Sequence, residues 1–165
     1  MTMIADVNAM TAADFLKAFG DVAEHSSWMA REAAGFRPFT DRDDMIRHFE
    51  GALKSANRDA QLALIRAHPD LAGRAKLTDD STREQAGAGL NNLTTEEFAR
   101  LTVLNDAYKQ RFGFPFVLAV KGATKQMILE SFEARVENAA DAEFAMALSQ
   151  VCRIFRFRIE DRVQA

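Results

Sequence analysis

The sequence predicts an all-α fold, a single compact bundle of about seven or eight helices over residues 1–165, with one short extended segment. Apolar residues recur every three or four positions through most of the chain, which is the spacing of an amphipathic helix. Residues that cap helices precede these runs, and the connections are short, as in helical bundles. Hydrophobic residues make up 48% of the 165 residues, so one sizeable core can form.

The first part of the chain contains four predicted helices. The first begins at Thr11, and the second is the Ala-rich run that ends near residue 34. Thr40 or Asp41 is placed to cap the third, because both side chains can accept a hydrogen bond from a free backbone N–H. The fourth helix is expected over about residues 58–67.

Two later helices carry the pattern of a capping box, in which a hydroxyl caps the helix and a Glu three residues later reaches back. Ser81 with Glu84 fits this pattern, and so does Thr94 with Glu97. The second of these helices is expected to end at Gly113, because glycine readily takes the left-handed conformation that closes a helix.

Residues 114–122 form the one strand-like run. No other run of similar character could pair with it, and a lone strand is not stable, so an extended buried segment is predicted instead of a sheet. Thr124 then caps a further helix, and the last helix covers about residues 142–161.

Composition limits the partners of this protein. The net charge is −3 and the basic residues form no block, which argues against nucleic acid or an anionic membrane as a partner. The longest apolar run is far shorter than the ~20 residues that cross a bilayer. The single cysteine, Cys152, cannot form an internal disulfide and is predicted to be a small core residue. A reducing, cytoplasmic location is expected.

The strongest candidate for chemistry is His68. It directly precedes Pro69, so a helix should stop at or just before it and leave an imidazole at a helix end. A helix C-terminus favours the protonated ring, which suits acid–base work, and Glu84 is a second group able to move protons. Two plainer interpretations stay open: His68 could only end a helix, and Glu84 could only cap one. The other two histidines, His25 and His48, suit hydrogen-bonding and solvated roles.

The sequence contains no motif typical of a metal site, a phosphate-binding site or a serine nucleophile. The histidines are far apart in sequence, and neither a phosphate-binding loop nor a serine nucleophile elbow is present. An enzyme with this sequence would therefore work without a metal or cofactor. Arg158 lies between apolar Phe157 and Ile159 and could turn inward, where it would need a carboxylate from the protein or from a ligand.

Four ordered motifs resemble the OHCU decarboxylase family, in which OHCU stands for 2-oxo-4-hydroxy-4-carboxy-5-ureidoimidazoline. They are Ala-His-Pro-Asp-Leu-Ala-Gly-Arg at 67–74, Ser-Thr-Arg-Glu-Gln-Ala-Gly-Ala-Gly-Leu at 81–90, Leu-Asn at 104–105 followed by Tyr108, and Arg-Phe-Gly-Phe-Pro-Phe at 111–116. The loop between Leu71 and Ser81 is shorter than in some members. The resemblance implies packed helices, a homodimer, no cofactor, and decarboxylation of OHCU to (S)-allantoin in urate breakdown.

The resemblance also implies a set of site residues. His68 takes the place of the catalytic histidine, and we expect Glu84 to act as a second catalytic group. The extended run would line the site and bind the substrate through its backbone. The implied substrate-binding residues are Pro69, Ser81, Thr82, Arg83, Glu84, Gln85, Phe116, Val117, Leu118, Ala119, Val120 and Arg158.

Two other functions are open at this point. A helix followed by His-Pro-Asp is also the pattern of the J-domains that assist Hsp70 chaperones. Those domains need a basic face on the preceding helix, and here that helix offers only Arg58 and Arg66. A family member that has lost catalysis and serves as a structural subunit is the second alternative, although His68, Glu84 and Arg158 are all present.

Overall fold

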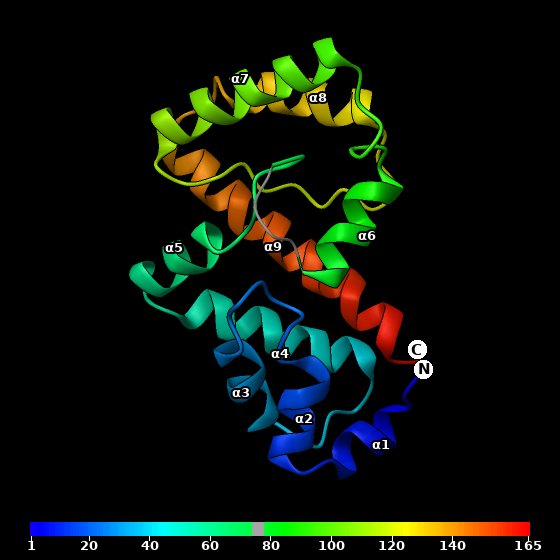
Figure 1. Ribbon diagram of the computed structural model, residues 1–165. Coiled ribbons are helices and arrows are strands. Elements are labelled where there is room, and N and C mark those ends of the chain that lie inside the picture. Colours follow the sequence, from blue (N-terminus) through cyan, green and yellow to red (C-terminus); the bar gives the residue numbers. More distant parts are fainter. Residues whose placement is uncertain (74–77) are drawn as a thin grey trace. The chain divides into compact units, whose positions relative to one another are not determined.

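The computed structural model describes residues 1–73 and 78–165, and this part of the chain is built from α-helices (Figure 1). One isolated bridge, between Thr2 and Val163, is the only β pairing in these ranges. The all-α prediction is therefore confirmed. The helices are α1 (Ile4–Ala9), α2 (Ala12–Phe19), α3 (Trp28–Ala34), α4 (Arg42–Ser55), α5 (Arg58–Arg66), α6 (Asp79–Gly87), α7 (Thr95–Phe112), α8 (Lys125–Arg135) and α9 (Ala140–Arg162).

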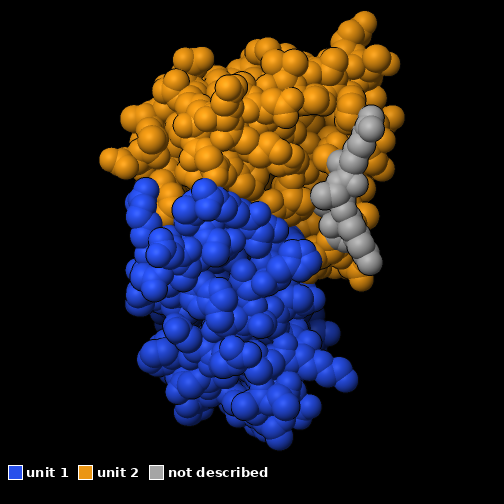
Figure 2. Space-filling model, turned by 60° about the vertical axis from the view of Figure 1, so that its left-hand side comes forward, with its two compact units in different colours: residues 1–67, 152–165 blue, residues 68–151 orange. Residues whose placement is uncertain are grey.

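The chain forms two compact units (Figure 2). Unit 1 comprises Met1–Ala67 with Cys152–Ala165, and unit 2 comprises His68–Val151. The division falls within α9, so each unit includes part of that helix.

Phenylalanine rings fill the core of unit 1. Phe15, Phe19 and Phe49 are almost completely buried, and the rings of Phe15 and Phe19 lie 5.1 Å apart between centroids. Phe155 from α9 joins them, 6.1 Å from Phe49. Each such ring removes a large apolar area from water, which is the main favourable term in folding.

The core of unit 2 is built around the extended segment that follows α7. The ring of Phe116, in this segment, stacks on Phe132 of α8 at a centroid distance of 3.8 Å. Tyr108 of α7 meets Phe116 edge-on at 5.3 Å and is fully buried. The sequence prediction of an extended buried segment in place of a sheet is confirmed, because residues 115–120 are neither helix nor strand.

Most of the predicted helix starts are confirmed. Thr11, Asp41 and Thr124 each accept a hydrogen bond from the backbone N–H three residues later. Thr94 and Glu97 form the predicted capping box. Gly113 ends α7 with a φ of 77°, in the left-handed region where glycine meets no steric penalty.

The capping box predicted at Ser81 and Glu84 is wrong. Helix α6 begins at Asp79, and its cap is Thr78, whose hydroxyl accepts from the N–H of Ser81. Two acidic residues, Asp79 and Asp80, then occupy the first turn, where the positive end of the helix dipole favours them. Glu84 consequently lies inside the helix and is not its cap.

Three smaller differences also appear. The six-residue α1 was not predicted, and no side chain caps it at Met3. Helix α9 begins at Ala140, two residues earlier than expected. Cys152 is half-buried, so the prediction of a core cysteine overstated its burial.

Candidate active site

His68 lies where the sequence predicts, just beyond the end of a helix. Helix α5 packs Leu64 and Ile65 into the core and ends at Arg66, and Ala67 caps it. Pro69 follows and prevents the helix from continuing. The His68 side chain is only 7% exposed, so its imidazole is largely shielded from bulk water.

Side chains from two helices of unit 2 hold the loop that follows His68. The Oε1 atom of Gln85 accepts a hydrogen bond of 2.9 Å from the backbone N–H of Ala72. The Nδ2 atom of Asn105 donates to the carbonyl oxygen of Leu71 at 3.1 Å. Ala72 has a φ of 53°, a left-handed conformation that costs energy for a residue with a Cβ. The surrounding bonds thus hold the loop in a conformation that it would not adopt alone.

One face of α6 carries three of the predicted site residues. Ser81 and Gln85 are buried, and Glu84 is half-buried. Positions three and four apart share a face of a helix, so these side chains lie on the same side as Ala88, which is also buried. The bond from Gln85 to the His68 loop shows that this face is turned toward the loop.

The other two residues predicted on α6 point to solvent. Thr82 and Arg83 are exposed. The Thr82 hydroxyl donates to the carbonyl oxygen of Thr78, and Arg83 pairs with Asp80 one turn earlier. The structure therefore brings Ser81, Glu84 and Gln85 toward the unit interior and leaves these two outside it.

Two side chains hold the extended segment, each through one backbone atom. Arg135 of α8 donates from Nη1 to the carbonyl oxygen of Val117 at 2.8 Å. Gln150 of α9 accepts a bond of 3.0 Å from the N–H of Ala119 at its Oε1. The Arg135 guanidinium also lies over the ring of Phe116, 4.3 Å from its centroid, a cation–π contact.

A buried carboxylate fixes Arg135 in turn. The Nε atom of Arg135 donates to Glu143 at 2.6 Å, and Tyr108 and Asn138 donate to the same carboxylate. Burial, together with the bond to Glu143, raises the pKa of Tyr108 well above its ordinary value. A charge that is paired and hydrogen-bonded can be buried at a lower cost than an isolated one.

Sequence reasoning missed Arg135 and Gln150, although a signal was available. Arg135 comes three residues after Phe132, on the face of α8 that buries Ile128 and Phe132. Gln150 directly precedes the buried Val151 of α9. A polar residue in an apolar register marks a buried hydrogen bond that the sequence alone cannot assign to a partner.

Arg158 turns inward, as predicted, and belongs to unit 1. Its side chain is 3% exposed, and its Nη2 atom donates to Glu24 at 2.9 Å, while Nη1 donates to the carbonyl oxygen of Val22 at 3.1 Å. The carboxylate that an inward arginine requires is thus Glu24, itself 1% exposed. Sequence reasoning did not identify this partner, which is 134 positions away in the chain.

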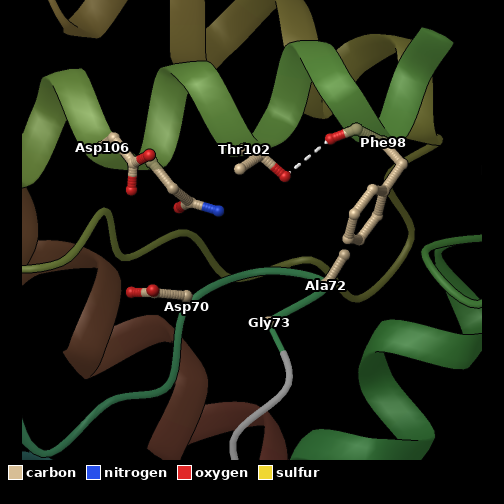
Figure 3. Close-up of a pocket in the computed structure, with 7 residues that line it drawn as sticks. Asp70, Ala72, Gly73, Phe98, Thr102 and Asp106 are labelled. Atoms are coloured by element: carbon tan, nitrogen blue, oxygen red, sulfur yellow. Dashed lines mark hydrogen bonds between the residues drawn. The ribbon is translucent and has the colours of Figure 1, made fainter. Parts of the chain in front are cut away.

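A pocket of about 220 Å³ lies between the loop that follows His68 and helix α7 (Figure 3). Asp70, Ala72 and Gly73 form one wall, and Phe98, Thr102, Asn105 and Asp106 form the wall on α7. Lys109 pairs with Asp70 at 2.7 Å at its rim. Within the described residues, this pocket is lined by none of the predicted site residues.

Two further observations concern the single cysteine and the length of the apolar helices. Burial raises the pKa of the Cys152 thiol to about 11, so it is protonated and weakly nucleophilic at neutral pH. Among residues 1–73 and 78–165, no helix is both long and apolar enough to cross a membrane.

Comparison with known proteins gives a consistent result. The chain is 44% identical to the uric acid degradation bifunctional protein PucL of Bacillus subtilis, covering 98% of this chain and 33% of that protein. It is 40% identical to 2-oxo-4-hydroxy-4-carboxy-5-ureidoimidazoline decarboxylase of Haloferax volcanii, covering 96% of this chain and 95% of that protein. It thus spans a third of the bifunctional relative and nearly all of the shorter one.

A solved structure also has a similar fold. A crystal structure of (S)-allantoin synthase superimposes with a TM-score of 0.83 at 27% identity, over 99% of this chain and 54% of the other. The family model described as OHCU decarboxylase matches residues 8–160, which takes in parts of both units. The J-domain alternative is therefore set aside, and the chain belongs to the OHCU decarboxylase family.

Proposed function

We propose that this protein is a carboxy-lyase that converts OHCU to (S)-allantoin in urate breakdown. The observation that carries the proposal is family membership over residues 8–160, together with a shielded histidine at the position of the family's catalytic residue. The curated relatives that bear the name of this decarboxylase extend over nearly the same length as this chain, as the Haloferax protein illustrates.

The reaction needs no external electron acceptor. The ring carbon that carries the carboxylate is bonded to a carbon of a C=N bond. When the bond to the carboxylate breaks, CO2 leaves, its bonding electron pair forms a C=C bond between the two ring carbons, and the nitrogen of the former C=N group takes up a proton. The hydroxyl on the first carbon then loses its proton as that carbon becomes a carbonyl, and a proton adds to the second carbon, which bears the ureido group. One net proton is taken up for each CO2 released.

The proposal gives most candidate residues a role. His68 moves the proton, and its delivery to one face of the ring sets the S configuration. Glu84 orients the ring and its hydroxyl group; its position inside α6 removes the competing role of helix cap. Pro69 borders the substrate, while Ser81 and Gln85 supply polar contacts. Arg158 remains in the proposed set on the resemblance alone, since its guanidinium pairs with Glu24 in this structure.

The backbone of residues 116–120 is proposed to bind the ureido and ring amides. Chain segments outside helices and sheets keep N–H and C=O groups that need partners, and a substrate rich in amides can supply them. Thr82 and Arg83 remain in the proposed set on the resemblance alone, since both side chains are exposed.

Three broader features belong to the proposal. The two compact units act as one functional domain, which is supported by a family match that spans both. The protein forms a homodimer and works without a cofactor, as the resemblance implies, and it works in the cytoplasm, as its single cysteine favours.

The proposal is tested by generating OHCU in situ from urate with the two preceding enzymes and following circular dichroism. We expect rapid formation of (S)-allantoin, and a His68→Ala variant at least about 100-fold slower, the usual scale of a lost acid–base group. His48→Ala is the matched control, because His48 lies in unit 1, half-buried and stacked on Phe36. Slow racemic product that the wild-type protein does not accelerate would overturn the proposal.

A further inference from the structure

Side chains from two helices hold the backbone of the extended segment along one edge, and at the end of the segment the N–H of Ala123 donates to the carbonyl oxygen of Val120. Its Val117 carbonyl oxygen accepts from Arg135, and its Ala119 N–H donates to Gln150. These two atoms belong to residues two positions apart. In an extended chain the N–H and C=O of one residue point to one edge, and those of the next residue point to the opposite edge. Both fastened atoms therefore lie on the same edge.

The residue between them presents its polar atoms to the other edge. Leu118 is the one half-buried residue in a run whose other members, from Phe114 to Val120, are buried. Within the described ranges, neither the N–H nor the C=O of Leu118 has a hydrogen-bonding partner. Unmet backbone groups in a mostly buried run are uncommon and indicate that something else binds there.

The groups that hold the fastened edge are themselves rigid. Arg135 is locked by the buried carboxylate of Glu143, which Tyr108 and Asn138 also bind. The guanidinium is planar, and its bonds to Glu143 and to Val117 have fixed directions relative to each other. It therefore fixes the position of the Val117 carbonyl oxygen more closely than a flexible side chain would.

We propose that Arg135 and Gln150 are positioning residues of the active site, which fasten one edge of the segment so that the N–H and C=O of Leu118 face the substrate. This proposal rests on the proposed function. A group with one donor and one acceptor side by side matches an amide or ureido group, which offers the complementary pair. Neither Arg135 nor Gln150 touches the substrate in this scheme; each acts through the backbone.

A purely structural role for the two side chains makes a different prediction. If they served only to satisfy buried backbone atoms, their loss would lower the melting temperature and leave substrate binding unchanged. A positioning role predicts weaker binding at a nearly constant turnover number. Contacts that bind substrate and transition state equally well affect KM and not kcat.

The test compares two variants and one control in the circular dichroism assay, each made in the 165-residue chain. Arg135→Lys keeps the charge beside Glu143 but loses the planar fork that also reaches Val117. Gln150→Met keeps the volume and removes the acceptor for Ala119. We expect each to raise KM about fivefold to tenfold with kcat nearly unchanged, the effect of one misplaced hydrogen-bonding pair.

Tyr108→Phe is the matched control. It removes a bond to Glu143 from the same buried network but leaves both backbone fasteners in place. It should lower the melting temperature and keep the wild-type KM. If Arg135→Lys fails to fold, Gln150→Met decides the question, because it introduces no charge change.

The outcomes separate this proposal from the proposed function. Raised KM in the fastener variants, with the control unchanged, supports positioning. An active wild type with unaltered KM in Gln150→Met overturns positioning alone, as does an equal rise in the control. A wild-type protein without activity on OHCU overturns both.

Discussion

Among residues 1–73 and 78–165, each unit buries one arginine against one glutamate, but the two pairs are built differently. In unit 2, Glu143 accepts from Arg135, Tyr108 and Asn138, and Arg135 reaches on to the extended segment. In unit 1, Arg158 bonds Glu24 and the carbonyl oxygen of Val22, two residues earlier in the same turn.

The difference indicates two uses of the same chemistry. The Arg135–Glu143 pair joins α7, α8, α9 and the segment between α7 and α8, so it organises the framework of unit 2. The Arg158–Glu24 pair joins α9 to the turn that follows α2. Breaking a buried pair by removing one partner costs more when the removed group served more partners, because each of them loses its bond.

The largest expected effect comes from removing the carboxylates. Glu143→Ala should lower the free energy of unfolding by about 4 to 5 kcal/mol, because three donors lose their acceptor and a buried cation is left unpaired. Glu24→Ala also leaves a buried arginine without its carboxylate and should cost about 3 to 5 kcal/mol. Urea unfolding measures the loss in each variant. A loss below about 1 kcal/mol in either variant would place that pair with the exposed ion pairs.

A smaller effect is expected at Tyr108, and it depends on pH. Tyr108→Phe should cost about 1.5 kcal/mol near neutral pH, the value of a hydrogen bond to a charged group. Burial and Glu143 raise the pKa of Tyr108 in the folded protein, so the unfolded chain ionises first. The stabilising contribution is therefore present below the ordinary tyrosine pKa near 10 and is lost as the pH rises above it.

The free energy of unfolding, measured between about pH 8 and pH 11, tests whether this contribution is lost as the pH rises. The range includes the ordinary tyrosine pKa of about 10. The wild type should lose stability above about pH 10 more steeply than Tyr108→Phe. Parallel curves for the two proteins would show that Tyr108 ionises equally easily in both states.

The smallest effect is expected at an exposed pair of unit 2. Arg100 and Glu133 approach to 3.1 Å, but their side chains are about half exposed. Exposed ion pairs contribute little because water and salt screen them, so Arg100→Gln should change the free energy of unfolding by about 0.5 kcal/mol or less. A loss as large as that of Glu143→Ala would mean that burial is not what distinguishes these pairs. Thermal or urea unfolding is sufficient to decide.

Local rules predicted most of the fold, and they failed where two local signals compete. Thr94 and Gly113 lie at helix ends that sequence alone identifies, because capping depends on atoms within one turn. Ser81 has the same capping chemistry as Thr78, three residues earlier, and the acidic first turn selects Thr78. The inward turn of Arg158 was predictable from its apolar neighbours.

The partners of buried polar residues were not predictable in this way. Gln150 meets Ala119 across 31 positions, and Arg158 meets Glu24 across 134. Such contacts depend on how helices pack, and no spacing rule within one element contains that information. On α6, sequence reasoning placed all of residues 81–85 at the site. Helical periodicity separates the buried Ser81 and Gln85 from the exposed Thr82 and Arg83.

The fully buried Tyr108 has an optical consequence. It is the single tyrosine of the chain, and Trp28, at the start of α3, is the single tryptophan. One chromophore thus lies in unit 2 and the other in unit 1. Tryptophan fluorescence and tyrosine near-ultraviolet absorbance therefore follow the melting of the two units separately, in the unlabelled wild-type protein. Coincident curves would identify a single cooperative transition.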